Sequence, residues 1–270
     1  MQTAEQPAGD SRGIVHPKAV GALFDVTRSL PSAALAPFVA YVWTVEWDLP
    51  ADRRHVQRVL PNPSVHLSIE PDIARVTGPL RSSSDGYPLT GTGRVVGIRF
   101  RPGGARPWLA GAVSALTDRE QPVTVLADLD VPALQDAVRT APDAAAAAGL
   151  VDAALVPHRP DDDPQIERAD ALVDLVGAEP GICRVDDLAR RVGSTVRSLQ
   201  RFCAEWIGVG PKELIRWARL HEAAARAAAG PVDWAALAAE LGYADQAHLV
   251  RDFAAVVGEP PARYARSETA

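Results

Sequence analysis

Arginine and glutamine side chains recur at helical spacing in two segments of the C-terminal third of the chain, residues 195–202 and 245–253, and the second segment also contains His248. Arginine and glutamine are the side chains that make paired hydrogen bonds with the guanine and adenine edges of the DNA major groove. A histidine on the same helix face can donate to a phosphate oxygen. These residue types and their spacing therefore point to recognition of double-stranded DNA.

The elements that would position these side chains are two helix-turn-helix patterns in tandem. In each, a short amphipathic helix ends near a glycine, Gly193 or Gly242, and a polar residue, Thr195 or Asp245, opens the next helix. Glycine suits the turn because it adopts positive φ without strain. Thr and Asp accept hydrogen bonds from the free N–H groups of a helix start. A second helix placed in this way enters the major groove, and two copies are far more specific than one.

In the first unit, Leu199, Phe202 and Trp206 share one helix face and are predicted to be buried. The polar residues lie away from that face. A solvated helix face would also explain them, but the helix-turn-helix setting favours DNA contact. The candidate DNA-binding residues of this unit are Thr195, Arg197, Ser198, Gln200 and Arg201.

In the second unit, the predicted buried face is Leu249, Phe253 and Val256. Gln246 falls in the first turn, where an inserted helix approaches base edges. His248 either donates to a phosphate or is solvated, and Arg251 either contacts DNA or pairs with a nearby acid. The candidate DNA-binding residues of this unit are Asp245, Gln246, His248 and Arg251.

One long helix is predicted between the two units, from Pro211 to about Ala229. Proline suits the first turn of a helix, and Gly230-Pro231 would end it. A rigid connector fixes the separation of the recognition helices. To bind one face of DNA they would lie roughly 34 Å apart, one turn of duplex.

Residues 166–266 resemble the DNA-binding domain of AraC/XylS-type transcriptional regulators. The resemblance implies a seven-helix domain that binds adjacent major-groove segments, and it assigns base contacts to Arg197, Gln200, Arg201, Gln246 and Arg251. Three positions depart from the family pattern: Cys203 replaces a Phe, Ala247 a Ser, and Gly210 a Ser. The matching landmarks are Leu188-Ala189, Leu199-Gln200-Arg201, Gly208-Val209-Gly210-Pro211, Arg219-Leu220, Ala223-Ala224, Gly242-Tyr243-Ala244-Asp245-Gln246, His248, Arg251, Phe253, Gly258 and Pro260-Pro261-Ala262-Arg263-Tyr264.

The N-terminal half has a different character. Residues 38–47, 56–60, 65–69 and 94–101 have strand patterns, which suggests a small barrel or sandwich. Residues 58–67 and 96–104 resemble N-terminal domains of a divergent subset of the same regulators, which implies a cupin-like β-barrel followed by helices. Helices are expected at 105–115, 128–140 and 143–156; the last two either join two subunits or cover one end of the barrel.

The predicted fold class is therefore α+β and multidomain, with a mainly β N-terminal domain and an all-α C-terminal domain. Residues 1–18 are expected to be a disordered tail and 19–156 a sensor or dimerisation domain. Residues 157–164 contain three prolines and an acidic run, which is typical of a stiff, hydrated linker. Residues 165–270 would be the DNA-binding domain.

Aromatic and basic residues make the most pocket-like group in the N-terminal half. Strand alternation places Arg99 and Arg101 on one face, and paired arginines would suit an anionic ligand. The alternative is that the arginines face solvent and the aromatic residues are core. The candidate effector-binding residues are Trp43, Trp47, His66, Arg99 and Arg101.

Composition argues against several other classes. Both cysteines, Cys183 and Cys203, follow residue 182, so the N-terminal half has no thiol nucleophile. The histidines are not spaced as metal ligands, and no catalytic residue, metal or cofactor is expected. The net charge of −6 is unfavourable for DNA, but residues 184–226 carry nine basic and five acidic side chains, a local charge of +4. Without a secretion signal or an apolar span, the expected location is the cytoplasm.

The sequence thus predicts a bacterial-type, non-enzymatic, ligand-responsive transcriptional regulator. An effector would act by favouring one placement of the DNA-binding units across the linker. Three alternatives stay open: a constitutive regulator whose N-terminal domain only dimerises, an enzyme fused to a DNA-binding tail, or a helical domain that binds only proteins. The expected partners are double-stranded DNA, a small-molecule effector, a second subunit and RNA polymerase, with no membrane.

Overall fold

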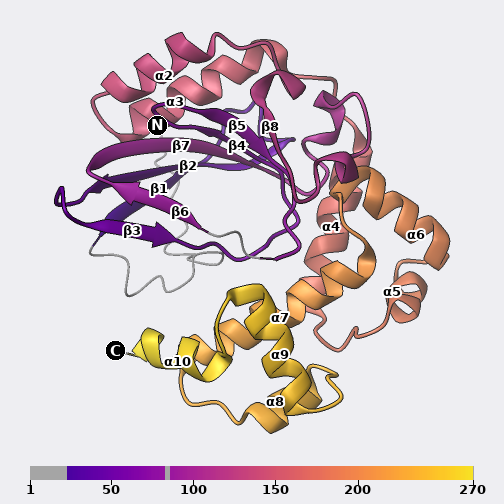
Figure 1. The fold of residues 1–270 in the computed structure, drawn as a ribbon. Helices are drawn as coiled ribbons and strands as arrows, with labels where there is room; N and C mark the ends of the chain where they lie inside the picture. Colours follow the sequence, from indigo (N-terminus) through magenta and orange to yellow (C-terminus); the bar gives the residue numbers. More distant parts are fainter. Residues whose placement is uncertain (1–22, 83–85, 270) are drawn as a thin grey trace, which may run out of the picture.

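The computed structural model describes residues 23–82 and 86–269, so the predicted tail at 1–18 lies outside the described residues. The N-terminal domain is built on antiparallel strands (Figure 1), and its mainly β character is confirmed. The strands are β1 (Phe24–Ser29), β2 (Val39–Asp48), β3 (Arg54–Gln57), β4 (His66–Ile69), β5 (Ala74–Thr77), β6 (Tyr87–Thr90), β7 (Thr92–Phe100) and β8 (Glu120–Pro122).

Six of these strands form one sheet in the order β1-β2-β7-β4-β5-β8, and β3 pairs separately with β6. The long central strands β2 and β7 run antiparallel, with Trp43 opposite Gly97 and Trp47 opposite Gly93. A Cβ on Gly97 would lie 2.1 Å from the Trp43 ring, so each indole lies flat over a glycine of the neighbouring strand. The two-stranded β3-β6 sheet lies on the side of the main sheet opposite the helices (Figure 1).

Helices α2 (Val131–Thr140) and α3 (Ala144–Leu155) lie across one face of the six-stranded sheet (Figure 1). Their buried side chains, such as Val151 and Leu155, join the strand residues in the domain core. Asp130 and Asp143 cap them by accepting from backbone N–H groups of the first turn. This pair therefore covers one face of the sheet (Figure 1), and not the end of a barrel that was one of the two expectations.

The helix expected at 105–115 is wrong. The structure has two short 3-10 turns there, η1 (Arg106–Trp108) and η2 (Val113–Leu116). Pro107 lacks the N–H that an interior helical position needs, and Gly111 favours an open chain, so a continuous helix is interrupted twice.

The C-terminal domain is entirely helical beyond residue 164 among the described residues, as predicted. It consists of α4 (Pro164–Ala178), α5 (Val185–Arg191), α6 (Val196–Phe202) with its π-helical extension η5 (Cys203–Ile207), α7 (Pro211–Ala229), α8 (Trp234–Glu240), α9 (Gln246–Val257) and α10 (Pro261–Thr269). In this part of the chain no helix is long and apolar enough to cross a membrane.

Two separate hydrophobic cores divide this domain. Leu188, Leu199 and Cys203 belong to the first, and Leu237, Leu249 and Phe253 to the second. Helix α7 enters both: Leu214, Ile215 and Trp217 pack in the first core, and Leu220, Ala223, Ala224 and Ala227 pack in the second. The long predicted connector is thus the element that joins the two units.

The segment 157–164 contacts the N-terminal domain. Arg159 donates to the Ala34 carbonyl at 2.9 Å and lies over the Phe38 ring. Ile166, in the first turn of α4, is buried in the N-terminal core. The proline-rich segment therefore holds α4 against the N-terminal domain instead of separating the two domains.

Candidate nucleic-acid interface

The two turns that precede the recognition helices have identical hydrogen bonding. Gly193 donates to Arg190 and Ser194 donates to Ala189. The second turn repeats the pattern, with Gly242 donating to Ala239 and Tyr243 to Ala238. Both glycines have positive φ, 63° and 69°. This is the Schellman arrangement, which ends a helix sharply and sets the exit direction of the chain.

The recognition helices α6 and α9 also begin identically. Thr195 Oγ1 accepts from the Ser198 N–H at 3.1 Å, and Asp245 Oδ1 accepts from the His248 N–H at 2.6 Å. Each cap satisfies a backbone donor at the third helical position. Thr195 and Asp245 thus orient their helices, and Ser198 hydrogen-bonds the Thr195 hydroxyl at 3.0 Å.

Buried stripes fix which face of each helix turns outward. In α9 the predicted core residues Leu249, Phe253 and Val256 are buried. In α6 and its extension the buried residues are Leu199, Cys203 and Ile207, whereas Phe202 and Trp206 are half-buried and stack on each other. Cys203 thus takes the core position, and burial raises the pKa of its thiol to about 12.

The opposite face of α6 presents Arg197, Gln200 and Arg201 to solvent. No hydrogen bond or ion pair joins these three side chains to any described residue. Five other arginines of the domain each pair with a carboxylate: Arg184, Arg190, Arg191, Arg216 and Arg226. Arg168 and Arg219 instead lie over the rings of Phe202 and Tyr243.

In α9, Gln246 and Arg251 are exposed and equally unpartnered within the described chain. The acids that could have paired with Arg251 are engaged elsewhere: Asp252 binds Arg216 at 2.7 Å, and Asp245 caps the helix. His248 is exposed, with its ring edge-on to Tyr243 at 5.2 Å. At least one arginine without a partner among the described residues therefore lies on each recognition helix.

Comparison with known proteins agrees with this geometry. Residues 188–267 match the family of helix-turn-helix domains. The C-terminal domain is an AraC-type DNA-binding domain. It belongs to a transcription regulator that binds DNA, and the predicted resemblance is confirmed.

Residues 27–122 match a domain of unknown function, DUF6597. No curated protein matches the chain. Among solved structures, ToxT from Vibrio cholerae is similar at 12% identity and a TM-score of 0.40, with 92% of this chain and 98% of ToxT covered. ToxT bound to (E)-4-(8-methylnaphthalen-1-yl)but-3-enoic acid is 11% identical with a TM-score of 0.40, and the match covers 91% of this chain and 99% of ToxT. Wild-type ToxT from the same organism bound to unsaturated fatty acid is 13% identical with a TM-score of 0.37, and the match covers 90% of this chain and 95% of ToxT.

Four of the five candidate effector residues lie on one face of the sheet, but Trp47 lies at the far end of it, opposite Gly93 and packed near Phe24, Leu49 and Leu89. Strand register places His66 opposite Arg99, and Trp43 and Trp47 lie on the same sheet face, the one turned away from α2 and α3. Arg99 donates to the Tyr41 hydroxyl at 3.2 Å and to the Ser64 hydroxyl at 3.1 Å. No carboxylate among the described residues pairs with it.

Arg101 lies apart from this group. Strand β7 ends at Phe100, so alternation no longer places the next arginine on the sheet face. Its guanidinium pairs with Asp170 of α4 at 2.6 Å. A cleft of ≈ 340 Å³ beside it is lined by Arg101 and residues of the segment 157–164, including Asp162 and Asp163.

Burial, followed by the nearby charge of Arg99, lowers the pKa of His66 to about 3, so its imidazole is neutral at neutral pH. Sequence reasoning missed Tyr41 and Ser64, which orient Arg99, and Asn62, whose Oδ1 lies 3.2 Å from His66 Nε2. The alternation of β2 could have revealed Tyr41, since it shares a face with Trp43. Three or more potential metal ligands do not cluster anywhere in the described residues.

Proposed function

We propose that the two recognition helices bind adjacent major-groove segments, with Arg197, Gln200 and Arg201 contacting bases in one and Gln246 and Arg251 in the other. The observation that carries this proposal is the unpaired state of the recognition-helix arginines in a domain whose other arginines are largely ion-paired. A guanidinium without an internal carboxylate keeps its donors for guanine O6 and N7. Thr195, Ser198, Asp245 and His248 position the helices or contact phosphates.

The test is a selection from random duplex DNA with the full chain and two variants. The double variant Arg197→Ala and Arg201→Ala should lose the motif that the native protein enriches, because each bidentate pair supplies about 1–3 kcal/mol of discrimination. Arg190→Ala is the matched control. It removes an exposed arginine from the same unit, but one that pairs with Asp187 on α5. Motif retention in the double variant would overturn the proposal.

The N-terminal domain, in this proposal, senses an anionic small molecule on the sheet face that carries Trp43, Trp47, His66 and Arg99. Arg99 supports this role because its partners, Tyr41 and Ser64, are neutral, so its charge stays uncompensated. The flat indole surface over Gly97 would suit an apolar ligand body beside that charge.

A thermal-shift screen with a panel of aliphatic and aromatic carboxylic acids tests the sensing role. At least one acid should raise the melting temperature of the native protein, and Arg99→Met should abolish that shift. Arg119→Met, at an exposed arginine of the same domain, should preserve it. A panel without any effect, or a shift that persists without Arg99, would favour a domain that only dimerises.

A further inference from the structure

Residues 60–64, in the loop between β3 and β4, touch both domains. At one end, Leu60 is only 6% exposed and belongs to the hydrophobic core of the second helix-turn-helix unit, with Leu220, Val256 and Val257. At the other end, Ser64 is 2% exposed and binds Arg99 on the sheet face. A segment of five residues thus spans from the candidate effector site to the DNA-binding domain.

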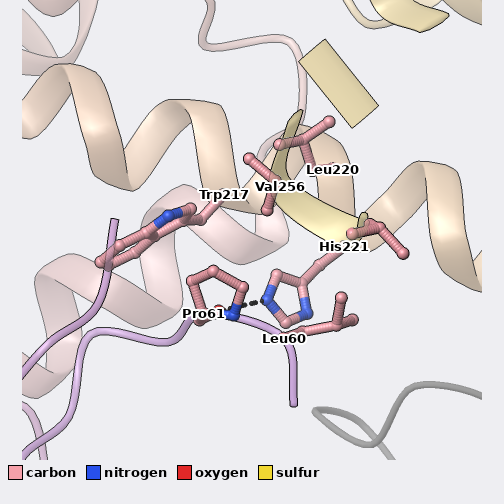
Figure 2. Close-up of a pocket in the computed structure, with 7 residues that line it drawn as sticks. Leu60, Pro61, Trp217, Leu220, His221 and Val256 are labelled. Carbon is pink, nitrogen blue, oxygen red and sulfur yellow. Dashed lines mark hydrogen bonds between the residues drawn. The ribbon is translucent and has the colours of Figure 1, made fainter. Parts of the chain in front are cut away.

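Figure 2 shows the contact with the DNA-binding domain. His221 of α7 points at the Pro61 carbonyl, and the two are joined by a hydrogen bond of 2.9 Å. A carbonyl oxygen only accepts, so Nε2 of His221 carries the proton in this contact. Trp217, Leu220 and Val256 surround the same point and enclose Pro61 and Leu60.

The place of this contact on α7 is specific. Trp217 is the last buried residue of α7 in the first core, and Leu220 is the first one in the second core. The loop therefore contacts α7 at the boundary between the first and the second helix-turn-helix unit. A displacement of the loop would act on α7 at this point, and through α7 on the angle between α6 and α9.

The loop is also stiff and anchored at its sheet end. Pro61 and Pro63 fix their own φ, and each restricts the residue before it. Asn62 lies 3.2 Å from His66, and Ser64 3.1 Å from Arg99. Arg99 and His66, which hold the loop at this end, are both candidate effector residues. A movement of either side chain would therefore displace Ser64 or Asn62.

We propose that the 60–64 loop couples the Arg99–His66 sheet face to the junction of the two helix-turn-helix units and so sets their relative placement. That an effector uses this coupling to regulate DNA binding rests on the proposed sensing function. The coupling itself runs through contacts of the loop with the two domains and requires no ligand. The first unit has its own anchors on the N-terminal domain, Thr117 to the Gly208 carbonyl at 2.6 Å and Arg106 to Glu205 at 2.6 Å. Movement of the loop would accordingly act on the second unit against a fixed first unit.

Fluorine NMR of the full chain labelled with 5-fluorotryptophan tests the link without DNA or ligand. The Trp217 and Trp43 resonances are assigned with Trp→Phe variants. Ser64→Ala, which removes the hydroxyl that holds Arg99, should shift the Trp217 resonance. Ser68→Ala is the matched control, since it removes another buried hydroxyl of the same strand region, outside the loop. The Trp108 resonance, from the N-terminal core, reports that each variant is folded.

Coupling is reciprocal, so His221→Phe on α7 should in turn shift the Trp43 resonance on the sheet face. A Trp217 resonance that responds to Ser64→Ala no more than to Ser68→Ala would overturn the proposal, and so would a Trp43 resonance unmoved by His221→Phe. These results are separate from the thermal-shift screen: a screen without hits would remove the effector while leaving the measured link in place.

Discussion

Individual side chains in this protein differ most in whether their charge has an internal partner. Arg216 and Arg226 are committed to carboxylates, whereas Arg197, Arg201 and Arg251 have none among the described residues. In the N-terminal domain, Arg99 faces neutral oxygen atoms and a neutral imidazole. Arginines without a carboxylate partner among the described residues thus occur on both candidate binding surfaces, the recognition helices and the sheet face of the N-terminal domain.

The partly buried His66 leads to a prediction about pH. Its pKa is about 3 in the folded protein against an ordinary value of 6.5, so between these values only the unfolded chain binds the proton. The stability that neutral His66 supplies is complete above pH 6.5 and declines as the pH falls toward 3. The free energy of unfolding, measured with urea, should therefore fall with pH below pH 6 more steeply in the native protein than in His66→Gln. The difference should be about 1 kcal/mol per pH unit.

His158→Gln is the control, because His158 is exposed near the end of the N-terminal domain. That variant should follow the native pH dependence. Equal slopes for the native protein and His66→Gln would contradict the burial of a neutral imidazole.

At the scale of elements, the features that the sequence predicted are those set by local chemistry. Gly193 and Thr195, like Gly242 and Asp245, specify a turn and a cap through neighbouring backbone groups, and the structure has both. Contacts between distant segments were not foreseen. Neither the packing of Leu60 in the second core nor the pairing of Arg101 with Asp170 leaves a periodic signal in the sequence.

Gly208, at the end of the π-helical extension, gives a prediction at this scale. Its φ is +95°, and a Cβ there would lie 2.9 Å from Val113 Cγ1 of the N-terminal domain. Gly208→Ala should lower the free energy of unfolding by at least about 1–2 kcal/mol, the typical cost of left-handed backbone in other residues. Urea denaturation measures this decrease in the free energy of unfolding, with Gly210→Ala as the control.

Gly210 lies two residues further on with φ −75° and has open space where a Cβ would be added. Its substitution should change stability by a few tenths of a kcal/mol at most. A similar decrease in the free energy of unfolding for the two variants would contradict the claim that the positive φ and the close approach at Gly208 require glycine for stability.

At the scale of the whole molecule, the N-terminal domain holds the DNA-binding domain at several places among the described residues, including α4 through Ile166 and the Arg101–Asp170 ion pair. The Thr117–Gly208 and Arg106–Glu205 contacts hold the first unit, and the 60–64 loop reaches the junction with the second. The two units share helix α7, which enters both of their hydrophobic cores. The fold class and the double helix-turn-helix were predictable from sequence, but this mutual docking was not, because it depends on the tertiary placement of α4 and α7.

The central claim is that α6 and α9 bind neighbouring major-groove segments as one assembly. Dimethyl sulfate protection on the selected operator tests it most directly, because the reagent methylates guanine N7 in the major groove. The account predicts two protected segments about 10 base pairs apart. Arg197→Ala with Arg201→Ala should expose one segment, and Arg251→Ala should weaken the other. A single protected segment, lost completely in either variant, would contradict the claim.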